Sequence, residues 1–292
     1  MSDRLRAWHE LALSALASIV LGLLLFLLTG CGGSSSQPAP PPSVPQAQLE
    51  RWFGYYGDCP TCFAETRGHV NMVWIAGWGG PRSVPEEIVT RTLEAHAAGK
   101  RVILMLPGVY LGDRFNPASI PLARGILSAL GPARASVYAF YPVDEPDLHG
   151  IGPDAIREAN AALRALAAEF GMAPRMAVIY AGANDFPGIE HYDDVSLDDY
   201  GAGESVLGAP TQKLLGALQP AQRAFLTVGG AEPWKTASEP FVARMEADPR
   251  IVGVVGFIWF DFADTGVGRG IRSNGLAPRY CAAAIRVTGG VC

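Results

Sequence analysis

The 292-residue chain lacks the motifs that mark several common classes of enzyme. It has no Gly-x-Ser-x-Gly elbow, so a serine hydrolase is not expected. Its five histidines are scattered, with neither His-x-x-x-His nor His-Glu-x-x-His, so a zinc hydrolase would lack ligands. No glycine-rich phosphate motif follows the first predicted strand, which weakens a nucleotide-binding interpretation. We therefore expect neither a metal nor a cofactor.

Charge is also sparse. Charged residues make up 17% of the chain, and the net charge is −5. No basic cluster stands out, which argues against a nucleic-acid partner. The sequence shows no repeat of fixed period and no heptad pattern, and we expect a monomer.

The N-terminus predicts export from the cytoplasm. Arg4 and Arg6 precede a mostly apolar run from Leu11 to Leu28, and Thr29-Gly30-Cys31 follows. A basic start, an apolar segment and small residues before a cleavage point are typical of a secretory signal. A transmembrane anchor is the alternative, because such an apolar run could nearly span a bilayer.

The tail Leu-Thr-Gly-Cys of this segment resembles the lipobox of bacterial lipoproteins. The resemblance implies that residues 1–30 are a signal peptide and that Cys31 is lipidated as the new N-terminus. Gly32 rather than Asp follows the cysteine, which by the same resemblance favours the outer membrane, on its periplasmic side or at the cell surface.

A tether and one folded domain are predicted beyond the signal. Residues 31–48 hold the lipidated cysteine and the segment GGSSSQPAPPPSVPQAQ, which is rich in proline and free of charge. Such a segment cannot bury a core and is expected to be an extended spacer. Residues 49–292 are close in length to the ~250 residues of a (β/α)₈ barrel.

Four cysteines remain once Cys31 carries lipid, and an even number in an exported protein indicates disulfides. Their order along the chain offers Cys59–Cys62 and Cys281–Cys292 as local pairs, although connectivity does not follow from sequence. The first pair could also be a redox or metal motif. A redox role would need a thioredoxin-like fold, of which there is no other sign, and zinc would need all four thiols to converge.

Eight short apolar runs alternate with helical patterns over the predicted domain, and this alternation predicts an α/β fold, a closed (β/α)₈ TIM barrel. The predicted strands are 52–56, 71–76, 101–106, 137–143, 176–180, 195–198, 224–228 and 252–260. The predicted helices are 84–98, 121–130, 153–170, 209–218, 239–247 and 279–287.

Two adjacent acids, Asp144 and Glu145, follow the fourth predicted strand. Reactive groups of such barrels sit at the C-terminal ends of the strands. Glycosidic bond cleavage commonly uses two carboxyl groups, and Glu145 fits the proton donor, with Pro146 expected to hold it in an extended turn. Asp144 would then be an orienting partner or a substrate contact. The alternative is a solvated loop made of turn-favouring residues.

This pattern resembles the large clan of (β/α)₈ retaining glycoside hydrolases, whose catalytic glutamates follow strands four and seven. Its strand-four motif is most often Asn-Glu-Pro, with Asp-Glu-Pro as a variant, so the resemblance implies that Glu145 is the acid/base. Trp259, on the eighth predicted strand, resembles the tryptophan platform that often lies under the sugar. Tyr200 resembles a tyrosine that supports the nucleophile.

The seventh predicted strand departs from the pattern of the clan, because no glutamate stands directly at its end. Glu232 comes four residues after Val228 and is the predicted nucleophile, provided that Gly229-Gly230 turns it inward. Carboxyl groups ~5 Å apart imply retention and ~6.5–9.5 Å inversion, and the sequence does not choose between them. Other candidates for the second carboxylate are Asp198, Asp199 and Asp261.

The predicted function is a membrane-tethered glycoside hydrolase that acts on an oligo- or polysaccharide. The alternative is a non-catalytic barrel lipoprotein that binds glycans or has a structural role in the envelope. Asp58 is expected to bind a sugar hydroxyl or to cap its loop. His149 could line the same pocket as Glu145. For any single aromatic residue, core packing is the alternative to contact with substrate. The predicted substrate-binding residues are Asp58, Trp78, Asp144, Asp199, Tyr200, Trp234 and Trp259.

Overall fold

The computed structural model describes residues 50–57, 62–75, 85–181, 185–198, 200, 208–261 and 268–292. Residues 48–292 group into one compact unit. Several sequence predictions lie outside the described residues: the signal peptide, the linker with Cys31, and Asp58, Cys59, Trp78 and Asp199.

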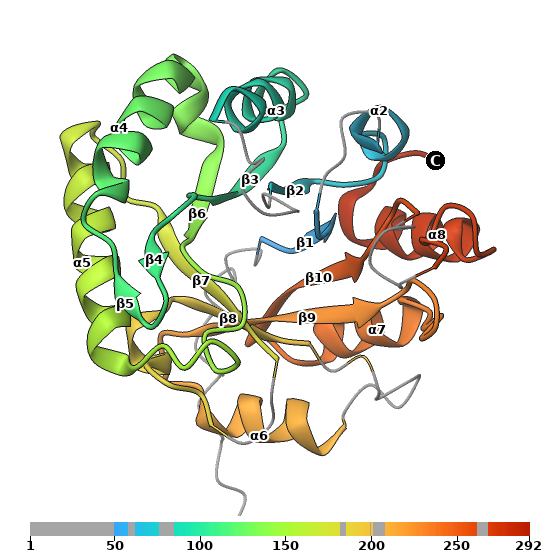
Figure 1. Ribbon diagram of the computed structural model, residues 1–292. Coiled ribbons are helices and arrows are strands. Elements are labelled where there is room, and N and C mark those ends of the chain that lie inside the picture. Colours follow the sequence, from blue (N-terminus) through green and yellow to red (C-terminus); the bar gives the residue numbers. More distant parts are fainter. Residues whose placement is uncertain are drawn as a thin grey trace, which may run out of the picture. The chain divides into compact units, whose positions relative to one another are not determined.

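Eight parallel strands form the inner ring of the fold, and each pairs with its neighbours in chain order (Figure 1). The first and last strands, β1 and β10, also pair in parallel, while β1 and β2 meet at an isolated bridge between Tyr56 and Trp74. The strands therefore make a nearly closed barrel, which confirms the predicted (β/α)₈ class. Their bounds are β1 Trp52–Tyr55, β2 Met72–Ile75, β3 Arg101–Met105, β6 Val137–Tyr141, β7 Arg175–Tyr180, β8 Asp194–Leu197, β9 Arg223–Gly229 and β10 Ile251–Phe257.

Helices surround this ring (Figure 1). The six predicted helices are all present, with ends within two residues of those predicted. The sequence did not indicate α2, the small hairpin β4–β5 or the short 3₁₀ helices η2 and η3. The bounds are α2 Cys62–Thr66, α3 Pro85–Ala97, β4 Tyr110–Leu111, β5 Arg114–Phe115, α4 Ser119–Leu130, η2 Gly131–Ser136, α5 Pro153–Glu169, η3 Ile189–His191, α6 Ala209–Ala217, α7 Glu239–Ala247 and α8 Ala277–Thr288. No helix among these described residues is both long and apolar enough to cross a bilayer.

The strands bury both faces, which explains their continuous apolar sequence. In β6, Phe140 packs toward the helices, whereas Ala139 and Tyr141 join the cluster that fills the barrel. Large aromatic side chains, including Trp52 and Trp74, occupy that interior. The barrel is thus a packed core, and the space for a ligand lies at its mouth.

Two glycines allow close contacts between neighbouring strands of the barrel. A Cβ on Gly54 of β1 would lie 2.5 Å from the carbonyl oxygen of Met72 in β2. A Cβ on Gly253 of β10 would lie 2.3 Å from the ring of Phe225 in β9. Any side chain at either position would push strands or core rings apart, so these sites require glycine for packing.

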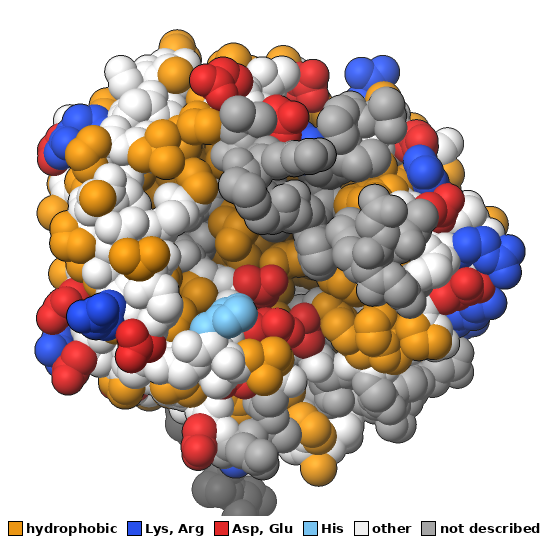
Figure 2. Space-filling view, in the orientation of Figure 1, with side chains coloured by type: hydrophobic (Ala, Val, Ile, Leu, Met, Phe, Trp, Pro, Cys, Tyr) orange, Lys and Arg blue, Asp and Glu red, His pale blue; other side chains and the backbone are white. Residues whose placement is uncertain are grey.

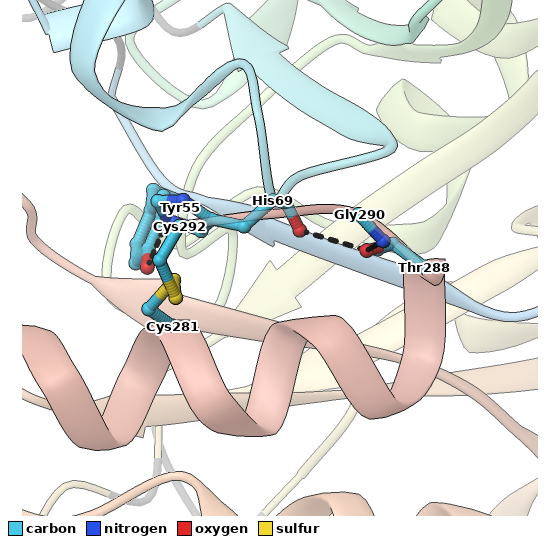
Figure 3. Close-up of a disulfide and its surroundings, with 6 residues drawn as sticks. All are labelled: Tyr55, His69, Cys281, Thr288, Gly290 and Cys292. Carbon is cyan, nitrogen blue, oxygen red and sulfur yellow. Dashed lines mark hydrogen bonds between the residues drawn. A yellow bond between two sulfur atoms is a disulfide. The ribbon is translucent and has the colours of Figure 1, made fainter.

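The C-terminal segment is fastened to the barrel beside β1 (Figure 3). Cys281 of α8 forms the predicted disulfide with Cys292. The Thr288 hydroxyl donates to the carbonyl oxygen of His69 at 3.1 Å, and the ring of His69 hydrogen-bonds to Tyr55. Cys62 is also disulfide-bonded, and its partner lies outside the described residues.

A buried ion cluster supports the N-terminal face of the barrel, away from the strand ends that carry Glu145. Asp194, whose side chain is 0% exposed, begins β8. It accepts hydrogen bonds from Arg175 Nε at 2.8 Å and Arg223 Nε at 3.0 Å, and Arg223 also donates to the Tyr138 hydroxyl. Polar contacts on this face of a barrel serve stability rather than chemistry.

Replacement of Asp194 by alanine should lower the free energy of unfolding by about 1–3 kcal/mol, because two partly buried guanidinium groups lose their counter-charge and their hydrogen-bond acceptor. Asp113→Ala is the matched control: that side chain is 71% exposed and should change stability by less than about 0.5 kcal/mol. Chemical denaturation of both variants measures the difference. Equal stability of the two would show that the cluster does not hold the barrel together.

Candidate active site at the barrel mouth

The acid pair lies where the sequence predicts it, directly after β6. Asp144 forms a parallel bridge with Ile179 of β7, and the Glu145 amide donates to the Ile179 carbonyl oxygen at 3.0 Å. Glu145 adopts φ +47°, a left-handed conformation that is uncommon for a residue with a side chain. The expectation of an extended turn at Glu145 was therefore wrong. Strained backbone of this kind concentrates at functional sites.

Asp144 is fixed by two phenol groups. The Tyr56 hydroxyl, at the end of β1, donates to Oδ2 at 2.7 Å, and the Tyr141 hydroxyl, at the end of β6, donates to Oδ1. Burial raises the pKa of Asp144, although both hydrogen bonds act in the opposite direction. With both oxygens occupied, Asp144 suits an orienting role rather than direct attack on a substrate.

Glu145 has the properties of a proton donor. Burial, followed by the negative charges of Asp144 and Asp147, raises its pKa to about 7. No described residue donates a hydrogen bond to its carboxyl group. About half of the molecules should therefore carry a proton on Glu145 at neutral pH, which is the state that general acid catalysis requires.

Asp198 brings a further carboxyl group to the same mouth, directly after β8. The Tyr200 hydroxyl donates to its Oδ2 at 2.7 Å, whereas Oδ1 is buried and accepts no hydrogen bond from a described residue. Burial raises the pKa of Asp198 well above its usual value, and the charges of Asp144, Glu145 and Asp147 add to the rise. This electrostatic coupling groups the four acids, which we call the acid cluster.

Aromatic side chains border the acid cluster. Tyr200 stacks on Phe257 with ring centroids 4.9 Å apart, and Trp234 lies 4.6 Å from Tyr200. Trp234 is partly exposed and was predicted to contact substrate, whereas Phe257 was not singled out. Figure 2 shows acidic side chains gathered near the middle of the face in view, with a histidine and hydrophobic side chains beside them. Among the described residues, no three acidic, histidine or cysteine side chains are arranged to hold a metal ion.

Glu232, the predicted nucleophile, makes its contacts elsewhere. Its Oε1 lies 2.7 Å from Lys235 Nζ and 3.0 Å from Arg269 Nη2. These hydrogen bonds lower its pKa to about 2. No described interaction joins Glu232 to Glu145, so the nucleophilic role stays a prediction that these contacts do not support.

Two further predicted residues also have partners outside the acid cluster. Trp259 is 6% exposed, packs against Tyr55 and donates its indole N–H to Glu65 at 2.7 Å. Its neighbours belong to the core between the barrel and the helices, not to the mouth. Asp261 accepts from the Gly270 amide at 2.9 Å and thus stabilises a turn.

No protein-family model matches the chain, and no curated protein matches it in sequence. Solved structures do resemble it in fold. A glycoside hydrolase family 17 β-1,3-glucanosyltransferase from Rhizomucor miehei has a TM-score of 0.53 at 17% identity, covering 75% of this chain and 92% of that one. A family 128 endo-β-1,3-glucanase from Amycolatopsis mediterranei has a TM-score of 0.51 at 15% identity, covering 80% and 99%.

A β-glucuronidase from Ruminococcus gnavus also shares the fold, with a TM-score of 0.53 at 14% identity. The match covers 82% of this chain and 48% of that one. Identities this low establish the barrel fold and do not transfer an activity. The structural neighbours of this barrel are nevertheless glycoside hydrolases.

The raised pKa of Glu145 predicts a pH dependence of stability. A carboxyl group whose folded pKa is about 7, above an ordinary value of 4.5, stabilises the folded state fully below pH 4.5. That contribution is lost as pH rises through 7. The stability of the parent relative to Glu145→Gln should therefore fall between pH 4.5 and 7, because glutamine does not titrate.

Free energies of unfolding measured at half-unit steps from pH 4 to 8 check this difference. Glu94→Gln, an exposed change on α3, is the control and should run parallel to the parent. A constant difference between the parent and Glu145→Gln across this range would contradict the assignment of a raised pKa to Glu145.

Proposed function

We propose that the protein is a glycoside hydrolase in which Glu145 protonates the leaving oxygen and Asp198 supplies the second carboxylate. The observation that carries the proposal is the pKa of Glu145 of about 7, in an acid cluster at the C-terminal ends of the barrel strands. Reactive groups of (β/α)₈ enzymes sit at this end, and a protonated and an ionised carboxyl group are what glycoside cleavage needs.

Asp198 suits the second role because its two oxygens differ. Oδ2 is held by Tyr200, whereas Oδ1 is buried and accepts no hydrogen bond from the described part of the chain, which leaves Oδ1 as the oxygen to act on a sugar carbon or a water once one of them enters the mouth. Burial raises the pKa of Asp198 well above its usual value, so Asp198 must lose a proton before it can act. A proton resident on Glu145 removes one of the negative charges that raise this pKa and so favours that ionisation. Asp198 then acts as nucleophile or as base for water.

Glu232 is not used in this proposal. Two cations already neutralise its carboxylate, and reaching the acid cluster would require breaking both ion pairs. Trp234 keeps its predicted role: its partly exposed ring, supported by Tyr200, offers an apolar face on which a sugar ring can stack.

The lipid tether is also part of the proposal. A lipidated Cys31 followed by a proline-rich spacer would hold the barrel near a membrane, outside the cytoplasm, where glycans are accessible.

We expect the parent chain to incorporate a labelled fatty acid in cells and Cys31→Ala to lose that label, because the thiol is the proposed site of lipidation. Metabolic labelling with immunoprecipitation measures the label, and labelling that survives the substitution would contradict lipidation at Cys31.

Activity is tested with the full chain held in lipid nanodiscs and a panel of β- and α-linked oligosaccharides and aryl glycosides. Reducing ends are counted for the parent and for three variants. Glu145→Gln should lower kcat/KM by about 10²–10⁴-fold, the range for loss of a general acid. Asp198→Asn should lower kcat by a comparable factor because the second carboxylate is lost, while Glu232→Gln should stay within a few-fold of the parent.

The variants also separate the alternatives. Loss of activity in Glu232→Gln with retention in Asp198→Asn would reverse the assignment of the second carboxylate. A parent that cleaves nothing, yet gains melting temperature from one of the glycans, would instead be a glycan-binding barrel.

A further inference from the structure

A cavity of about 680 Å³ opens beside the acid cluster. Its walls come from α3, the segment after β3, the hairpin strand β4, α4 and the loop after β6. Its volume is within the range of ~300–1,000 Å³ that is usual for small-molecule sites. The described residues that form its apolar wall include Ile88, Leu106, Val109, Leu122 and Val143.

The lining of this cavity is mostly apolar. Leu122 of α4 remains 41% exposed, although most leucines of this domain are buried. Proline side chains, including Pro107 and Pro142, add further apolar surface without flexible polar groups. A sugar unit bound against this wall would find few hydrogen-bond partners among the described residues that form it, which costs free energy, whereas an apolar group would be favoured.

The cavity is continuous with the acid cluster through the loop after β6. Asp144 lies on its edge, and His149, four residues after Glu145, lies on the same edge. The two polar groups are close enough that the charge of His149 lowers the pKa of Asp144. The cavity wall therefore includes the residue that precedes the proposed proton donor, although Glu145 itself is not among the described residues that form the wall.

The position of a proton donor indicates where the leaving group lies. In glycoside cleavage, the acid delivers its proton to the oxygen that joins the sugar to the departing group. The departing group must therefore lie on the side of the acid. At this mouth, the apolar cavity borders Asp144, the neighbour of that acid in sequence, and offers space for a departing group.

We propose that this cavity binds an apolar aglycone, an alkyl or aryl group joined to the sugar through the scissile oxygen. The inference rests on the proposed hydrolase function and names its substrate class. The C–O bond between the sugar and the oxygen of the aglycone breaks, and Glu145 gives that oxygen its proton. Water forms the new C–O bond at the sugar and returns a proton to Glu145, so the products are a free sugar and an alcohol or phenol.

Binding without turnover tests the cavity independently of catalysis. The full chain with Glu145→Gln, in nanodiscs and with empty nanodiscs as the blank, is titrated with methyl, octyl and 2-naphthyl glycosides of glucose, mannose and glucuronic acid. Saturation-transfer NMR reports affinity and identifies which ligand protons touch protein. For at least one sugar, the octyl or naphthyl glycoside should bind at least tenfold more tightly than the methyl glycoside, with the strongest transfer to aglycone protons.

Two exposed leucines make a matched pair of variants. Leu122→Asp, on the cavity wall, should remove most of the tenfold advantage because it places a charge against the aglycone. Leu93→Asp, on α3 at 43% exposure and outside the cavity lining, should leave the advantage intact. Equal melting temperatures of the two variants show that neither effect arises from unfolding.

The outcomes separate the two levels of the proposal. Affinity that is equal for methyl and apolar glycosides, absent for all of them, or unaffected by Leu122→Asp would overturn the aglycone site. Selective binding of apolar glycosides that the parent chain does not cleave would support the site and contradict the hydrolase. The octyl and naphthyl arms distinguish an alkyl from an aryl occupant.

Discussion

The candidate site depends on closure of the barrel between β10 and β1. Trp52, Phe53, Gly54 and Tyr55 pair in register with residues 253–256, and this ladder brings the end of β1 into the same mouth as the ends of β6 and β8. Tyr56 can then donate to Asp144 although 88 positions separate them. In an open sheet of the same strands, β1 would lose its β10 partner and this contact would not be held. Glycine at position 54 allows β1 to lie close to β2, and glycine at position 253 of β10 leaves room for the ring of Phe225 from β9.

Closure has an electrostatic consequence. It gathers Asp144, Glu145, Asp147 and Asp198 at one mouth, and burial raises the pKa of Asp144, Glu145 and Asp198. Phenol hydroxyls supply the hydrogen bonds that keep Asp144 and Asp198 in place. The arrangement destabilises the ionised form of the cluster, and the compact barrel and the Asp194 ion cluster on the opposite face compensate. Natural proteins commonly accept such a local loss of stability at a site where chemistry occurs.

The fold could be predicted from sequence because strands buried on both faces appear as continuous apolar runs, and eight of them alternate with helical patterns. The acid pair could be found from its place after the fourth run. The contacts of Trp259 could not be predicted. β10 ends at Phe257, so strand alternation does not determine the direction of a side chain two residues later. Phe257 stacks on Tyr200 near the acid cluster, and Trp259 packs behind the barrel.

Contacts between distant segments account for the other differences between the sequence predictions and the structure. Glu232 has the spacing expected of an inward-turned glutamate, but Arg269, 37 positions away, and Lys235 neutralise it. Nothing in the local sequence indicates that Glu232 pairs with Arg269. Glu145 likewise combines a left-handed backbone with a hydrogen bond to Ile179 in a neighbouring strand, a contact that the local sequence does not indicate. The phenol donors to Asp144, Tyr56 and Tyr141, lie at the ends of β1 and β6. Their role depends on the pairing of distant strands and does not follow from the sequence around either tyrosine.

The proposed chemistry requires Glu145 to be an acid that keeps its proton near neutral pH. Carbon-13 labelling of glutamate side chains, with Glu145 assigned by comparison with Glu145→Gln, allows NMR to follow the titration of that one carboxyl group. We predict a midpoint about pH 7, and a lower midpoint in Asp144→Asn, because the negative charge of Asp144 is one of the causes that raise the pKa of Glu145. A midpoint near 4.5 that does not respond to Asp144 would contradict the proposed catalytic arrangement.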